Sequence, residues 1–110
     1  MSSVKSCKVI AYFSIAPVGH KSTSMGSYVA VAIAAMNEVK GLKYEITPMG
    51  TVMEADSLEI IFEAVKVAHE AIACKGILRV ASTLIIDDRR DKPRIMQDKV
   101  NAVEKYMKQV

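Results

Sequence analysis

The central stretch of the chain decides its fold. Residues 43–54 read KYEITPMGTVME. Lys43–Thr47 predicts a short strand, because aromatic and β-branched side chains alternate with polar ones. Pro48-Met49-Gly50 predicts a turn, and Thr51–Glu54 predicts the next strand. The two strands should therefore form a hairpin in the middle of the chain.

A strand and a helix precede this hairpin. Residues 7–16 place apolar side chains at alternate positions, which is the pattern of a strand. Pro17-Val18-Gly19 should end it, because Pro lacks the N–H that a sheet ladder needs. Residues 28–40 are rich in Ala and predict a helix, and Gly41 supplies its C-terminal stop.

A second helix and a further strand follow the hairpin. Asp56 and Glu59 have the spacing of a capping box, with Asp56 at the cap, which predicts a helix from Leu58 to about Lys75. Residues 77–87 predict a long strand. A last amphipathic helix is expected after a charged turn. Its apolar positions are Ile95, Met96, Val100, Val103 and Met107.

The order of these elements indicates the fold class. Two successive strand–helix–strand units predict an α+β, ferredoxin-like βαββαβ sandwich with an extra C-terminal helix. Both main helices should cover one face of an antiparallel sheet. With 110 residues, of which 51% are apolar, the chain has the size of one ordinary domain. We therefore expect a single domain over residues 1–110 that needs no disulfide or metal for its stability.

Composition and charge disfavour several classes of protein. The formal net charge of +3 is too small to indicate nucleic acid or an anionic membrane as partner. No apolar run reaches the roughly 20 residues of a membrane span, and the first residues lack a signal-peptide core. Cys7 and Cys74 match no metal or redox motif, and His20 and His69 barely supply a zinc site or a triad. A cytoplasmic protein without metal or cofactor is expected.

The apolar surface predicts self-association. Residues 28–36 have no polar face, and the helix from Leu58 presents two apolar stripes. The second face of the sheet is also mixed, with Ile10, Tyr12 and Ile85 on it. A small domain cannot cover all of these surfaces by itself, so we expect a homodimer or a homotetramer. The alternative is that alanine-rich faces tolerate water, against which the β-branched residues on both helices count.

Two groups of residues could form a site. In this fold the loop after the first strand and the turn at 48–51 lie at the same edge, beside the helix start at Ser22–Ser24. Free backbone N–H groups there favour an anion or a polar ligand. The opposite edge gathers Tyr44, Glu54 and Asp88, which suit a ligand that offers hydrogen-bond donors and a cation. From the residues alone, ordinary turns and a solvated charge network remain the alternatives.

Several segments together resemble one known family. Tyr44–Thr51 followed by Glu54 is similar to the signature hairpin of the small thiamine-binding protein family, also called YkoF-like. Ile86–Asp91 resembles the exit of its last strand, and Pro17-Val18-Gly19 resembles its first loop. The resemblance implies ferredoxin-like subunits that assemble through their sheets. It also implies binding of thiamine or its hydroxymethylpyrimidine part, without catalysis.

The resemblance and the residue chemistry together give candidate ligand contacts. A carboxylate could accept a hydrogen bond from the amino group of a pyrimidine, and an aromatic ring could stack on it. Loop amides could bind a hydroxyl or a phosphate. The candidates are Tyr12, Gly19, Ser24, Tyr44, Met49, Gly50, Thr51, Glu54 and Asp88. His20 stands where the family's first loop usually has Thr, which could alter ligand preference.

Two other functions remain open. A small enzyme acting on a phosphorylated metabolite would need a nucleophile or a base, for which only His20, Glu54 and Asp88 are plausible. A structural or regulatory subunit would need no small ligand. RNA binding is disfavoured, because Thr51–Glu54 offers no aromatic side chain on which a base could stack.

Overall fold

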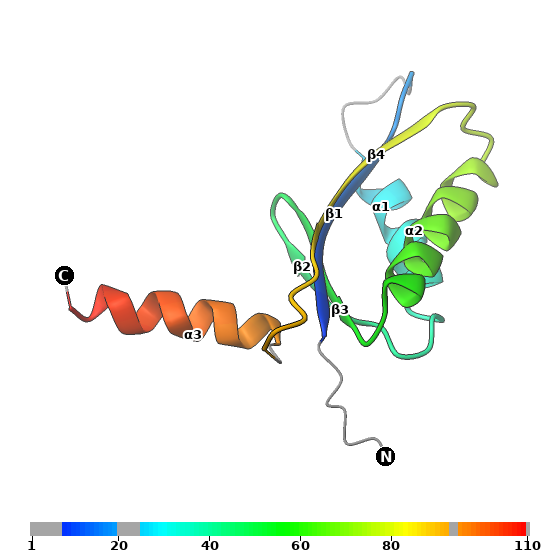
Figure 1. Ribbon diagram of the computed structural model, residues 1–110. Coiled ribbons are helices and arrows are strands. Elements are labelled where there is room, and N and C mark those ends of the chain that lie inside the picture. Colours follow the sequence, from blue (N-terminus) through cyan, green and yellow to red (C-terminus); the bar gives the residue numbers. More distant parts are fainter. Residues whose placement is uncertain (1–7, 20–24, 93–94, 110) are drawn as a thin grey trace, which may run out of the picture.

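The computed structural model describes residues 8–19, 25–92 and 95–109. Its elements are β1 (Val9–Pro17), α1 (Gly26–Met36), β2 (Lys43–Thr47), β3 (Gly50–Ala55), α2 (Leu58–Ala73), β4 (Val80–Asp87) and α3 (Met96–Met107) (Figure 1). This order confirms the βαββαβ pattern with an extra C-terminal helix that the sequence predicts.

The four strands form one antiparallel sheet. Their order is β2-β3-β1-β4, so β1 lies in the centre. Phe13 of β1 pairs with Thr51 of β3 on one side and with Leu84 of β4 on the other. Helices α1 and α2 cover one face of the sheet, whereas α3 stands on the other side (Figure 1). The ferredoxin-like fold is thereby confirmed.

The core lies between the sheet and the two covering helices. Alternate residues of β1 point into it, and Val9, Ala11 and Phe13 are all buried. The helices also bury small residues, Ala32, Ala64 and Ala68, and a few large side chains fill the rest of the core. Burying each large apolar side chain contributes roughly 1.5–3 kcal/mol. The largest fully buried side chains are Phe13, Met36, Met53, Ile61 and Ile72.

The N-terminal cap of α2 differs from the prediction. Ser57, not Asp56, is the capping residue, and its Oγ accepts a hydrogen bond from the N–H of Ile60 at 3.4 Å. Asp56 lies one residue too early and forms an ion pair with Lys8 instead, with Nζ and Oδ1 2.5 Å apart. Both residue types are good caps, so the sequence pattern could not separate them.

Two other elements are shorter than predicted. Helix α1 ends at Met36 rather than near residue 40, and the chain then turns as far as Gly41, whose φ is +84°. Strand β4 begins at Val80 rather than at residue 77, and Val80 pairs with Pro17, the last residue of β1. One further backbone hydrogen bond follows, from the N–H of Val18 to the carbonyl oxygen of Arg79 at 2.8 Å.

Within the described ranges, none of the helices has both the length and the apolar character that crossing a membrane requires.

Candidate functional site

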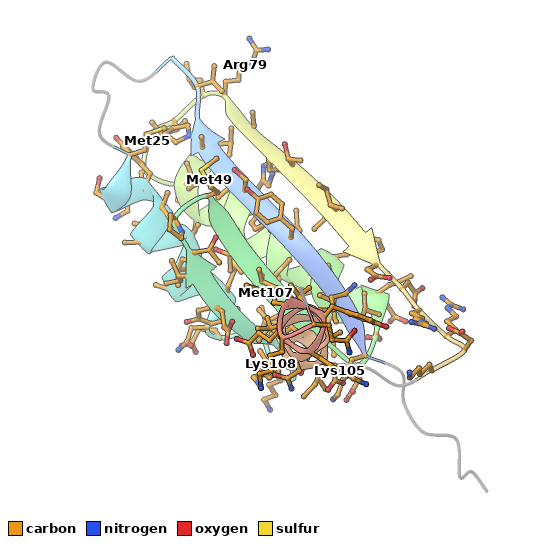
Figure 2. All side chains as sticks on the ribbon, turned by 90° about the vertical axis from the view of Figure 1, so that its left-hand side faces the viewer. Met25, Met49, Arg79, Lys105, Met107 and Lys108 are labelled. Atoms are coloured by element: carbon orange, nitrogen blue, oxygen red, sulfur yellow. The ribbon has the colours of Figure 1, made fainter. Side chains whose placement is uncertain are left out.

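A cavity of about 250 Å³ lies between α1 and the β2–β3 hairpin, on the side of the sheet that the helices cover. Met25, directly before α1, and Met49, in the hairpin turn, are both exposed and both line it, and Figure 2 shows them at the same end of the molecule. The lining residues are Phe13, Ser14, Ile15, Met25, Val29, Ile33, Met36, Ile46, Thr47, Pro48, Met49, Gly50 and Thr51.

The hairpin turn that forms one wall is fixed by its own hydrogen bonds. The Oγ1 of Thr47 donates to the carbonyl oxygen of Gly50 at 2.7 Å and accepts from the N–H of Gly50 at 3.2 Å. Such a side-chain-to-backbone pair stabilises a tight turn. The turn therefore forms without help from a ligand.

Tyr12 holds the same turn from the other face of the sheet. Its hydroxyl donates a hydrogen bond to the carbonyl oxygen of Met49 at 2.5 Å. Its ring lies so close to Gly50 that a Cβ at that position would be 2.7 Å from the ring. Only glycine fits under this ring without displacing it, so Tyr12 and Gly50 together fix the position of Met49.

Thr51 is the buried polar residue among the described residues that line the cavity. The residue is 6% exposed, and its hydroxyl has no hydrogen-bond partner in the part of the chain that the structure describes. Buried polar groups almost always have a partner, so an unpaired one calls for an explanation. A ligand in the cavity would supply the missing partner.

The rest of the cavity wall is mostly apolar. Among the described residues that line it, Ser14 and Thr47 are the other hydroxyl-bearing ones, and none carries a charge. A wall of this kind favours an uncharged ligand with a few polar groups over a phosphate or an ammonium group.

Part of the predicted site is brought together here. Met49, Gly50 and Thr51, predicted as ligand contacts, all line the cavity. Gly19, with a φ of +83°, lies in the loop after β1 and does not line it. Ser24, the remaining candidate at this edge, lies outside the described residues, as does His20.

The two candidate tyrosines lie on opposite faces of the sheet. Tyr12 belongs to the open face and is engaged with the turn, as described above. Tyr44 pairs with Met53 on the helix-covered face, and its hydroxyl donates to the Oδ1 of Asn37 at 3.1 Å. It lines a shallow groove beside α1 rather than the cavity. The two rings therefore do not stack on one ligand in this cavity.

The two candidate carboxylates lie away from the cavity. Glu54 is buried on the open face of the sheet, where its Oε2 accepts a hydrogen bond from the N–H of Met96, the first residue of α3, at 2.8 Å. Asp88 follows β4 and forms an ion pair with Arg90 at 2.8 Å, which raises the pKa of the Arg90 guanidinium. Both carboxylates are occupied by contacts within the chain.

Helix α1 contributes most of the lining that sequence reasoning missed. Val29, Ile33 and Met36 of α1, with Met25 directly before it, recur at helical spacing and form one wall of the cavity. The apolar character of this segment was visible in the sequence and was assigned to a subunit interface. Because an apolar stripe looks the same toward a cavity or a partner, the pattern alone could not distinguish the two.

In the described part of the chain, no three His, Cys, Asp or Glu side chains come together as a metal site would require.

Comparison with known proteins places the chain in a family. A family model described as "Thiamine-binding protein" matches residues 11–104. A UPF0045 protein of Methanothermobacter thermautotrophicus is 47% identical over 96 residues, which cover 87% of this chain and 96% of the relative.

Solved structures show the same architecture. A hypothetical protein of Methanocaldococcus jannaschii superimposes with a TM-score of 0.79 at 39% identity, covering 88% of this chain and 96% of that one. A Thermotoga maritima protein, described as a candidate thiamine biosynthesis or salvage protein, gives a TM-score of 0.70 at 23% identity, covering 87% and 98%. At that identity, the second likeness shows the fold alone.

Proposed function

The chain belongs to the thiamine-binding protein family, and we propose that it binds the pyrimidine part of thiamine, or free hydroxymethylpyrimidine, in the cavity between α1 and the hairpin. The observation that carries this proposal is the buried hydroxyl of Thr51, which has no hydrogen-bond partner among the described residues, in a mostly apolar cavity. A hydroxyl can donate to a ring nitrogen or accept from an amino group, and an aminopyrimidine offers both.

The size of the cavity supports a single ring as the buried part of the ligand. Pockets for drug-sized ligands usually measure about 300–1,000 Å³, whereas this cavity measures about 250 Å³. The charged thiazolium of thiamine would then lie at the mouth, near Met25 and Met49. A cation there avoids the desolvation that an apolar interior would impose.

Binding without catalysis is part of the proposal. The enzymatic alternative named His20, Glu54 and Asp88. His20 lies outside the described residues, whereas Glu54 and Asp88 lie away from the cavity in contacts with α3 and Arg90. A structural subunit without a ligand would have no use for a cavity with an unpaired hydroxyl. Both features favour a binding protein over its two rivals.

Isothermal titration calorimetry tests the proposal with thiamine and hydroxymethylpyrimidine. Thr51→Val removes the hydroxyl at nearly constant volume, and Thr83→Val on the exposed part of β4 is the matched control. One neutral hydrogen bond contributes about 0.5–1.5 kcal/mol, so Thr51→Val should weaken binding about 2- to 12-fold. Thr83→Val should leave it unchanged.

A stability measurement on the same variants separates a ligand contact from a folding defect. Thr51→Val should leave the unliganded protein as stable as before or more so, because no partner of the hydroxyl is lost within the described structure. Ligand at 100 times its Kd should add about 2.7 kcal/mol of stability to the wild type. No heat and no thermal shift with millimolar ligand, or equal affinity in Thr51→Val, would refute the proposal.

Self-association is the second part of the proposal, as a homodimer or a homotetramer. Large apolar side chains are exposed on both layers of the sandwich, among them Ile46, Phe62 and Leu78. Covering them would stabilise the assembly by the hydrophobic effect.

A further inference from the structure

Tyr12 acts on the cavity turn without lining the cavity. Its neighbours in β1, Ala11 and Phe13, are buried on the helix-covered face, and successive side chains of a strand point to opposite faces. Tyr12 therefore lies on the open face, where it is half-buried, whereas the cavity lies on the other side of the sheet. Any effect of this residue on a ligand in the cavity passes through the backbone of the turn.

The peptide unit between Met49 and Gly50 is held at both of its polar groups. The hydroxyl of Tyr12 donates to the carbonyl oxygen of Met49 at 2.5 Å, and the Oγ1 of Thr47 accepts from the N–H of Gly50 at 3.2 Å. The carbonyl and the N–H of a trans peptide point in opposite directions. The two hydrogen bonds together therefore define how this peptide plane is oriented.

The backbone at Gly50 leaves this orientation open. Glycine adopts positive and negative φ about equally well, so no Cβ at position 50 opposes rotation of the peptide before it. The ring of Tyr12 occupies the space that such a Cβ would need, 2.7 Å away. The same close approach that excludes a side chain at position 50 thus removes a steric restraint on the turn. The hydroxyl of Tyr12 supplies a restraint in its place.

The orientation of this peptide matters for the cavity, because Met49 and Gly50 both line it. With the hydrogen bond from Tyr12 in place, the carbonyl of Met49 is directed to the open face. Rotation of the peptide by half a turn would direct it toward the side of the sheet on which the cavity lies. An acceptor without a fixed donor would then stand beside the mostly apolar wall, next to Thr51, where burial of an unpaired polar group is unfavourable.

We propose that Tyr12 is a positioning residue for the ligand cavity: its hydroxyl, from the opposite face of the sheet, holds the Met49–Gly50 peptide in the orientation that fits the ligand. The inference rests on the proposed function and adds to it a residue that does not touch the ligand. Without the hydroxyl, only a fraction of the molecules has the binding-competent turn, and the apparent Kd rises in inverse proportion to that fraction. The strength of one neutral hydrogen bond sets the size of the effect, about 2- to 12-fold.

Calorimetric titration of matched tyrosine variants with hydroxymethylpyrimidine is the first test. Tyr12→Phe removes the hydroxyl and keeps the ring over Gly50. Tyr44→Phe is the control, because it also removes one hydroxyl, which donates to the Oδ1 of Asn37 at 3.1 Å, and it does not line the cavity. Tyr12→Phe should weaken binding about 2- to 12-fold, and Tyr44→Phe should leave it unchanged.

The titration separates this inference from the proposed function. A wild type that binds hydroxymethylpyrimidine while Tyr12→Phe binds it equally well would overturn the inference alone. A wild type that does not bind it would refute the proposed function, and the effect on affinity with it.

Amide hydrogen exchange tests the same residue without a ligand. Tyr12→Phe should speed the exchange of the Gly50 amide relative to the amide of Phe13 in the central strand, because the peptide before Gly50 is no longer held. A general loss of stability would speed both amides together, and Tyr44→Phe should not change their ratio. An unchanged ratio in Tyr12→Phe would show that the turn keeps its conformation without the hydroxyl, which would refute the positioning role.

Discussion

A single methyl group at Gly50 would test the packing that holds the cavity turn in place. In Gly50→Ala, the new Cβ would lie 2.7 Å from two ring carbons of Tyr12 and from its hydroxyl oxygen, and the carbon contacts would be well inside the 3.5–4.0 Å that carbon atoms prefer. The backbone at Gly50 does not have a positive φ, so the contact with Tyr12 is the reason for the penalty. The ring must move, and its hydrogen bond to Met49 must lengthen or break.

The cost follows from these two effects. Overpacking of a filled site costs about 1–3 kcal/mol, and a neutral hydrogen bond contributes about 0.5–1.5 kcal/mol. Gly50→Ala should therefore lower the free energy of unfolding by about 2–4 kcal/mol. Gly26→Ala is the matched control, because no atom lies within 4 Å of its added Cβ. It should change stability by at most about 0.5 kcal/mol, or stabilise the start of α1 slightly.

Urea unfolding of a double-mutant cycle measures the effect. With Tyr12→Ala in place, the ring is absent, and Gly50→Ala should then cost less than about 0.5 kcal/mol. The coupling between the two positions should be at least about 1.5 kcal/mol. An equal cost of Gly50→Ala in both backgrounds would show that the ring is not the cause.

Four further variants test other parts of the fold. Ser57→Ala should lower the free energy of unfolding by about 1 kcal/mol through loss of the α2 cap, whereas Asp56→Ala should cost less than about 1 kcal/mol because it removes only an exposed ion pair; thermal unfolding of both variants checks this order. Glu54→Ala should weaken the attachment of α3 by about 1.5–3 kcal/mol, since the acceptor of the Met96 N–H is lost. Amide exchange should become faster in α3 and stay unchanged in α2, and exchange in α3 as slow as in the wild type would contradict this. Ile61→Ala should destabilise the protein by about 2–5 kcal/mol in urea unfolding, because Ile61 is fully buried in the core, and a loss below about 1 kcal/mol would show that the site is not tightly packed.

Local signals sufficed for most of the fold. The alternation in β1, the turn at Pro48–Gly50 and the positive-φ Gly41 are each set by near neighbours in the chain, and the structure confirms them. The cap of α2 was assigned one residue too early, to Asp56. Asp56 and Ser57 are both good caps, so their sequence does not decide between them. In the fold, Asp56 pairs with Lys8, which directly precedes β1, and Ser57 caps the helix.

The cavity was predictable only in part. The turn residues were singled out because turns of this fold gather at one edge, and Met49, Gly50 and Thr51 do line the cavity. Glu54 was predicted as a ligand contact because it was expected beside Tyr44 and Asp88 at one edge of the sheet, where a carboxylate could accept a hydrogen bond from an amino group. Its partner is the N–H of Met96, far along the chain. Only the folded structure shows that this charge is already used.

The central place of β1 also bears on how the chain reaches its native state. One of its two neighbours, β4, is synthesised last among the strands, and Ile10 pairs with Asp87. During translation, one edge of β1 therefore has no partner until nearly the whole chain has left the ribosome. An unpaired apolar strand edge recruits other chains, so premature termination before Val80 should yield aggregates rather than a smaller folded protein. Pairing across such a sequence distance also slows folding relative to a helical bundle.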